Sequence, residues 1–108
     1  MKIRLTNIAL EDLSSIEKYT RTNWGEQQAA VYMAQIENKM KNLLETPYLG
    51  TARPDVSDDY RCLPEGKHLI FYRIDNDIIS ILGIPHSNMD LERHLILPTK
   101  FTSDTLQK

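Results

Sequence analysis

Residues 60–84 read YRCLPEGKHLIFYRIDNDIISILGI, and this stretch decides the fold. Its apolar residues fall into short runs that are rich in β-branched and aromatic side chains and are bounded by turn residues. The runs predict three strands at 60–63, 67–74 and 78–84, with turns at 64–66 and 75–77. Because the last run is almost continuously apolar, as buried strands are, it is expected at the centre of the sheet. The stretch therefore predicts an antiparallel three-stranded meander.

Two amphipathic helices are expected before this meander. Residues 2–5 alternate between polar and apolar, which predicts a short first strand, and Thr6 or Asn7 then offers an oxygen that caps a helix. This helix is expected to end near Asn23, and a second helix to start just after Gly25. Apolar residues recur at three- and four-residue steps in both segments. Such a short connection predicts an antiparallel helix hairpin.

The remaining segments complete an α+β domain. Residues 47–59 contain two prolines, one glycine and several acids, and they predict a loop. After Pro85 we expect a short helix at 89–95, within a domain of residues 1–97 that is followed by a polar tail at 98–108. The predicted order is β-α-α-β-β-β with a short C-terminal helix, which places a helix hairpin on one face of a four-stranded, mostly antiparallel sheet.

The charge balance argues against a nucleic-acid binder. The 108 residues include 13 Lys and Arg against 15 Asp and Glu, a formal net charge of −2. Proteins that bind DNA or RNA through its phosphates usually carry a basic excess, so we expect no sequence-specific DNA binding by this chain alone. No apolar run approaches the roughly 20 residues of a membrane span. Since Cys62 is also the single cysteine, we expect a cytoplasmic protein with no membrane association.

Two small constellations have both a chemical and a structural interpretation. Cys62 precedes His68 across one predicted hairpin turn, which allows a Cys–His nucleophile, but without a third orienting group a buried thiol is favoured. His86, Asp90 and His94 have the four-residue spacing of metal ligands on a helix. A predicted helix cap just after His86 places that residue outside the helix, so we expect no metal ion and no cofactor.

Three arginines form a more informative group. Arg61 and Arg73 lie on adjacent predicted strands, and Arg53 lies in the loop that feeds the first of them. Together with Tyr72 and His86, a concave arginine cluster is suited to phosphate or carboxylate groups. The alternative is a solvated sheet face on which the arginines pair with the aspartates of the same loop.

The residues that carry a family resemblance span both halves of the chain. In the first half they are Ala9, Asp12-Leu13, Ile16, Tyr19-Thr20, Trp24-Gly25, Gln28-Ala29 and Tyr32. In the second half they are Leu43-Leu44, Pro47, Gly50, Arg53, Tyr60-Arg61, the run from Gly66 to Arg73, and then Ile84, His86 and Met89-Asp90. With this order and spacing, residues 3–95 resemble ParE-type toxins. Pro85 departs from the aliphatic residue that is usual before the histidine.

The resemblance implies the RelE/ParE fold and the toxin half of a type II toxin–antitoxin pair. ParE-type toxins are understood to inhibit DNA gyrase by binding, without catalysis, and so to block replication. Their partner is a ParD-like antitoxin that wraps the toxin in a hetero-oligomer. On this basis we expect antitoxin contacts at the helix hairpin and at Arg53, Arg61, Arg73 and Tyr72. By elimination, contacts to the target are expected at His86, Met89, Asp90 and Arg93.

Two alternatives remain at this level. RelE-type relatives share the fold but cut mRNA on the ribosome, and His86, Arg61 and Arg73 would then be the catalytic residues. The lysine-rich surface that would grip RNA is missing, because Lys67 is the only lysine between Lys41 and Lys100. The other alternative is a member of the fold that has lost toxicity and serves only as a binding partner.

Overall fold

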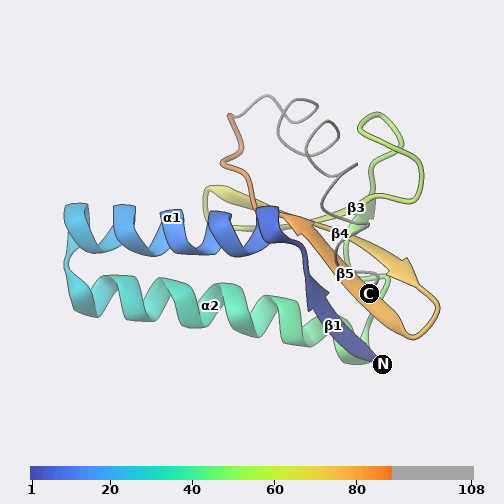
Figure 1. Cartoon of the computed structure of the whole chain (residues 1–108), viewed down its shortest axis with the longest axis horizontal. Helices are drawn as coiled ribbons and strands as arrows, with labels where there is room; N and C mark the ends of the chain where they lie inside the picture. Colours follow the sequence, from blue (N-terminus) through green and yellow to red (C-terminus); the bar gives the residue numbers. More distant parts are fainter. Residues whose placement is uncertain (89–108) are drawn as a thin grey trace.

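The computed structural model describes residues 1–88, which form two helices and five strands (Figure 1). In chain order these are β1 (Lys2–Leu5), α1 (Asn7–Trp24), α2 (Glu26–Glu45), β2 (Thr51–Ala52), β3 (Arg61–Glu65), β4 (His68–Asp75) and β5 (Ile78–Gly83). The order and the α+β class agree with the prediction. The predicted helix at 89–95, the domain boundary at 97 and the tail at 98–108 lie outside the described residues.

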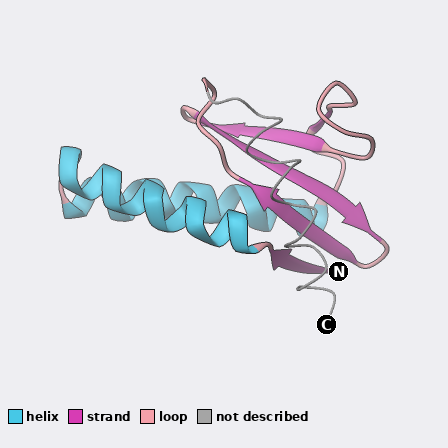
Figure 2. Cartoon of the chain, turned by 45° about the horizontal axis from the view of Figure 1, so that its top comes forward, coloured by secondary structure: helices cyan, strands magenta, loops and turns pink. Residues whose placement is uncertain are grey.

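The strands form one mixed sheet in the order β1-β5-β4-β3-β2. Strand β1 runs parallel to β5, and the other neighbours are antiparallel. Strand β5 is thus an interior strand, which fits its apolar sequence, but the centre of the sheet, where it was predicted, is occupied by β4. Figure 2 shows both helices on one side of this sheet. None of the helices formed by residues 1–88 is long and apolar enough to cross a membrane.

The sheet has five strands rather than the four predicted. The additional strand β2 lies in the segment predicted as a loop, where Thr51 pairs with Cys62 and Ala52 with Arg61. Two residues are too few to show a strand periodicity, so only the tertiary pairing reveals this strand. Strand β3 also continues through Pro64, which had been expected in a turn. Because β2 covers only the start of β3, Pro64 lies on a free edge, where its missing N–H costs no ladder bond.

The hydroxyl of Thr6 both caps α1 and joins the start of this helix to β5. Thr6 Oγ1 accepts from the Ala9 N–H at 3.1 Å, which makes Thr6 the N-cap, and it donates to the Leu82 carbonyl at 2.9 Å. Gly25 then connects the helices with φ of +95°, a backbone conformation that favours glycine. The helix hairpin is thereby fixed at both of its ends, against β5 and at its own tip.

The sheet buries apolar side chains on both faces. The main core lies between the helices and the sheet and includes Ile16, Ile36, Ile70, Tyr72 and Ile79. A smaller cluster lies on the other face and consists of Tyr60, Cys62, Phe71 and Leu82. Since side chains alternate along a strand, the face of any β3 or β4 residue follows from these two clusters.

Candidate functional site

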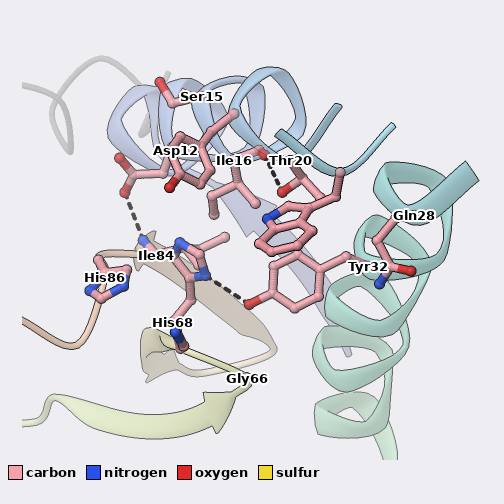
Figure 3. A pocket seen from close by; sticks show the side chains of 13 residues that line it. Asp12, Ser15, Ile16, Thr20, Gln28, Tyr32, Gly66, His68, Ile84 and His86 are labelled. Carbon is pink, nitrogen blue, oxygen red and sulfur yellow. Dashed lines mark hydrogen bonds between the residues drawn. The ribbon is translucent and has the colours of Figure 1, made fainter. Parts of the chain in front are cut away.

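A cavity of about 800 Å³ opens between α1, the first turns of α2 and the turn that joins β3 to β4 (Figure 3). The end of β5 and the residues that follow it close the remaining side. Most of the lining is apolar or aromatic, and a few polar side chains converge on it. The lining residues are Asp12, Ser15, Ile16, Tyr19, Thr20, Trp24, Gln28, Tyr32, Gly66, Lys67, His68, Ile84 and His86. Largely apolar cavities with a few placed polar groups are typical of binding sites.

Tyr32 and His68 form a hydrogen-bonded pair in the pocket. The Tyr32 hydroxyl lies 3.0 Å from the Glu65 carbonyl oxygen and 2.7 Å from His68 Nδ1. The hydroxyl has a single proton, which it donates to the carbonyl, so Nδ1 of His68 must carry the hydrogen that it shares with Tyr32. In the neutral ring the lone pair therefore lies on Nε2.

Gly66 allows this close approach. It has φ of +59°, and a Cβ built on it would lie 2.8 Å from the Tyr32 hydroxyl oxygen. A side chain at this position would push the turn away from α2.

His86 reaches the pocket because the chain after β5 is held against the β3–β4 turn. Leu69 N–H donates to the Pro85 carbonyl and Ser87 N–H to the Lys67 carbonyl, both at 2.9 Å. Pro85, which replaces the usual aliphatic residue, does not weaken this pairing, because residue 85 contributes its carbonyl and not an N–H. The His68 and His86 rings meet edge to face, with centroids 5.4 Å apart.

Asp12 connects α1 to the same corner of the sheet. Its Oδ2 accepts a hydrogen bond from the Ile84 N–H at 2.7 Å (Figure 3). This bond satisfies a backbone donor at the point where β5 ends and the chain turns toward His86. Asp12 thus helps to fix the position of His86 relative to the helix hairpin.

The environment lowers the pKa of His68. Burial is the main cause, the neighbouring His86 adds to it, and the carboxylate of Asp12 acts in the opposite direction. The pKa of Tyr32 is raised, mainly by burial and next by Glu65. Both shifts favour the neutral pair that the hydrogen bonds describe. Within residues 1–88 no group of three or more His, Cys, Asp or Glu side chains is arranged to hold a metal ion.

The three arginines do not form one cluster. Arg53 pairs with Asp55 at 2.9 Å and lies 5.5 Å from the Phe71 ring, on the sheet face away from the helices. Arg73 is on that face too, since it lies two residues from Phe71 on β4, and it pairs with Asp75 at 2.9 Å.

Arg61 lies on the helix face, because it stands directly opposite Tyr72 on β4. Its guanidinium donates to the carbonyls of Tyr48 and Gly50 and lies 5.1 Å from the Tyr48 ring. Strand β3 extends to Glu65 rather than ending at residue 63 as predicted, and in the resulting register Arg61 pairs with Tyr72. The prediction that Arg53, Arg61 and Arg73 form a single concave cluster is therefore wrong.

Tyr72 is a structural residue and not an exposed one. Its side chain is completely buried, and its hydroxyl donates to the Pro47 carbonyl and accepts from the Gly50 N–H, both at 2.8 Å. These bonds tie the segment after α2 to the sheet. The expectation that Tyr72 contacts an antitoxin is wrong for its side chain, because no accessible surface remains on it.

Cys62 and His68 lie on opposite faces of the sheet. Cys62 belongs to the cluster around Phe71, whereas His68 shares the helix face with Ile70. Burial raises the pKa of the Cys62 thiol, which disfavours the thiolate. The buried-thiol interpretation is confirmed. Three of the remaining candidates, Asp90 and His94 for a metal and Met89 for the target, lie outside the described residues.

Sequence reasoning found His86 but missed its neighbours Tyr32, His68 and Asp12 as one site. Arg93 was predicted as a contact to the target, but it lies outside residues 1–88. Tyr32, His68 and Asp12 were all noted as parts of the family pattern. Their residue types gave no signal of mutual contact, because they come from α2, β4 and α1 and meet only in the folded chain.

A comparison of the sequence with models of known protein families identifies the family of this chain. Residues 3–91 match the model of a protein family described as ParE toxin of type II toxin-antitoxin system, parDE. The chain belongs to the ParE toxin family. The family resemblance read from the sequence is thus confirmed over nearly the same residues, and the chain is a toxin of a type II toxin–antitoxin system.

Individual ParE relatives agree with this assignment. The chain is 30% identical over 92 residues to the Toxin ParE1 of Caulobacter vibrioides, covering 85% of this chain and 95% of that protein. It is 29% identical over 92 residues to the Toxin ParE1 of Mycobacterium tuberculosis, covering 84% of this chain and 94% of that protein. Among solved structures, a chain titled as the chromosomal ParDE TA system from P. aeruginosa superposes with a TM-score of 0.69 at 24% identity. That match covers 80% of this chain and 95% of the solved one and shows the shared fold.

Proposed function

We propose that this ParE-family toxin inhibits DNA gyrase by binding to it, and that a ParD-like antitoxin neutralises it. The observation that carries the proposal is the family match over residues 3–91, because the family resemblance implies this target and this partner. A gyrase inhibitor acts on a cytoplasmic enzyme, so we place the toxin in the cytoplasm. The hetero-oligomer with the antitoxin is the form in which the toxin is held inactive.

The positions of the nuclease candidates support a binding role over RNA cleavage. Arg61 and Arg73 lie on opposite faces of the sheet, and each guanidinium already has partners. His86 forms a bridge with His68, which lies four residues along β4 from Tyr72, the residue opposite Arg61. At about 3.3 Å per residue the two backbone positions are about 13 Å apart along the strand. The Arg61 guanidinium donates to the Tyr48 and Gly50 carbonyls instead of facing His86, which disfavours joint action on one phosphate.

Two surfaces remain as proposed contacts for the antitoxin. Arg53 and Arg73 lie on the same face of the sheet with 29% and 28% of their side chains exposed, so both can exchange an aspartate for a partner carboxylate. Arg61 and the 69% exposed ring of Tyr48 form a second surface near the end of α2. The pocket with His86, together with Met89, Asp90 and Arg93, is the proposed region for the target.

A parallel pair of assays tests the proposal. Purified toxin is added to gyrase with supercoiled and relaxed plasmid, and the same preparation is added to a cell-free translation reaction. Gyrase-dependent DNA cleavage or loss of supercoiling, with translation intact, is the expected result, and the antitoxin should abolish it. Cleavage of mRNA in the translation reaction would contradict the proposal, and inactivity in both assays would favour a toxin that has lost its activity.

A further inference from the structure

The face of the sheet that points away from the helices is apolar and buried. It carries the smaller apolar cluster, here called the outer cluster, which consists of Tyr60, Cys62, Phe71 and Leu82. Phe71 and Leu82 have no exposed surface, although both helices formed by residues 1–88 lie on the opposite face (Figure 2). Antiparallel sheets that are packed on one face commonly leave the other face polar and solvated. Another part of the chain therefore covers the outer cluster.

The loop between β2 and β3 covers the half of the outer cluster that lies nearest to it. Val56 packs against the cluster, and the Arg53 guanidinium carbon lies 5.5 Å from the centre of the Phe71 ring. Leu82 lies on β5, which is separated from β3 by β4. On the other side of β5, strand β1 ends before it reaches the level of Leu82. The apolar cover of Leu82 therefore has to come from another segment.

The described part of the chain ends beside this face. Ser87 N–H donates to the Lys67 carbonyl, and Leu69 N–H donates to the Pro85 carbonyl, both at 2.9 Å. Asn88 is thus held near the start of β4, where the partly buried Leu69 packs against the outer cluster. The cluster continues two residues further along β4, which is a distance of about 7 Å in a strand. The chain that follows Asn88 starts within reach of the outer cluster.

Residues 89–97 have the composition and the length for this cover. They read MDLERHLIL, and their apolar residues are Met89, Leu91, Leu95, Ile96 and Leu97. The short helix that the sequence predicts at 89–95 is about 10 Å long, which is enough to extend from the start of β4 across the cluster. Leu91 and Leu95 are four positions apart and share one face of such a helix, whereas Met89 and Arg93 share the opposite face.

We propose that residues 89–97 dock on the outer cluster, with Leu91 and Leu95 packed against Phe71 and Leu82. The occupant is this segment rather than a second copy or a partner protein, because Phe71 and Leu82 are already buried within a single chain. The segment is then an integral part of the folded toxin domain and not a free arm.

Docking in this orientation gives the segment an inner and an outer side. Met89 and Arg93 face outward, which presents two of the residues proposed as target contacts beside the end of the sheet where His86 lies. The docking concerns packing within the chain and stands whether or not gyrase is the target. It also shields Cys62, the single cysteine, which has 5% of its surface exposed.

Nuclear Overhauser contacts between methyl groups test the docking directly in the full-length toxin. We expect contacts from Leu91 and Leu95 to Leu82 and to the ring of Phe71. A sample that mixes isotope-labelled and unlabelled chains separates contacts within one chain from contacts between chains. Contacts found only between chains would replace the proposal with a dimer interface. It would equally be overturned if residues 89–97 contacted only residues outside the outer cluster, or contacted none.

The rate at which iodoacetamide modifies Cys62 provides a second measurement. Leu91→Asp and Leu95→Asp should each raise this rate by about tenfold or more, because a carboxylate placed against an apolar surface disfavours docking by at least this factor. Met89→Asp is the matched control, since it adds the same charge on the outward side and should leave the rate unchanged. Equal rates in all three variants would contradict the docking. If a leucine variant does not fold, the Overhauser contacts of the unmodified chain still decide the question.

Discussion

The Tyr32 hydroxyl lies 2.7 Å from Nδ1 of His68, and this contact joins the second helix to the turn between β3 and β4. The same hydroxyl donates to the Glu65 carbonyl, so a single oxygen satisfies one ring nitrogen and one backbone acceptor. The tautomer of His68, and with it the character of the pocket, follows from this relationship.

Replacing Tyr32 by Phe should destabilise the fold. The change leaves His68 Nδ1–H and the Glu65 carbonyl without their partner in a half-buried place, and we expect a loss of about 1–2 kcal/mol in the free energy of unfolding. Chemical denaturation monitored by fluorescence of Trp24 measures it. Tyr48→Phe is the matched control, because Tyr48 is 69% exposed and its hydroxyl should contribute almost nothing. Equal stabilities of the two variants would contradict the structural role of Tyr32.

His68 should make stability depend on pH. Its pKa is lower in the folded chain than the ordinary value near 6.5, so the unfolded chain binds more protons between these two values. The stability is therefore complete above the unfolded pKa and is lost as the pH falls below about 6.5 toward the folded pKa. Denaturation midpoints at a series of pH values measure this slope. His68→Gln should flatten it, and an unchanged slope in that variant would exclude His68 as its source.

Tyr72→Phe should be costly although it removes only one atom. The Pro47 carbonyl and the Gly50 N–H would both lose their partner beside a fully buried ring, which costs about 1–3 kcal/mol for each group that water does not reach. We expect a lower denaturation midpoint with unchanged antitoxin affinity of the folded fraction. A stable variant that binds the antitoxin more weakly would restore Tyr72 as a contact residue.

Arg73→Gln should weaken antitoxin binding without loss of stability. Its pair with Asp75 is about one-third exposed and contributes little to folding, about 0–1 kcal/mol. If Arg73 meets a carboxylate of the antitoxin, affinity should fall by up to about fivefold at low salt, and the difference should shrink as salt is added. Titration calorimetry at two salt concentrations measures this. Lys41→Gln, another exposed cation, is the control, and an equal effect of both variants would indicate a nonspecific charge effect.

The sequence by itself determined the elements and the family. The apolar periodicities of 2–5, of the two helices and of 60–84 predict the order of strands and helices, because burial of one face imposes a repeat that can be read locally. The missed strand Thr51–Ala52 shows the limit of this reasoning. Two residues have no repeat, and they become a strand only because β3 lies beside them.

Only the tertiary structure decided which side chains share a surface. One residue of register decides the face of a strand residue, and so Arg61 points toward the helices while Arg53 and Arg73 do not. In the same way, the pairing of Tyr32 with His68 depends on how α2 packs against a turn 33 or more residues later. Long-range packing is not encoded in local periodicity, and for this reason the family was evident from the sequence whereas the pocket was not.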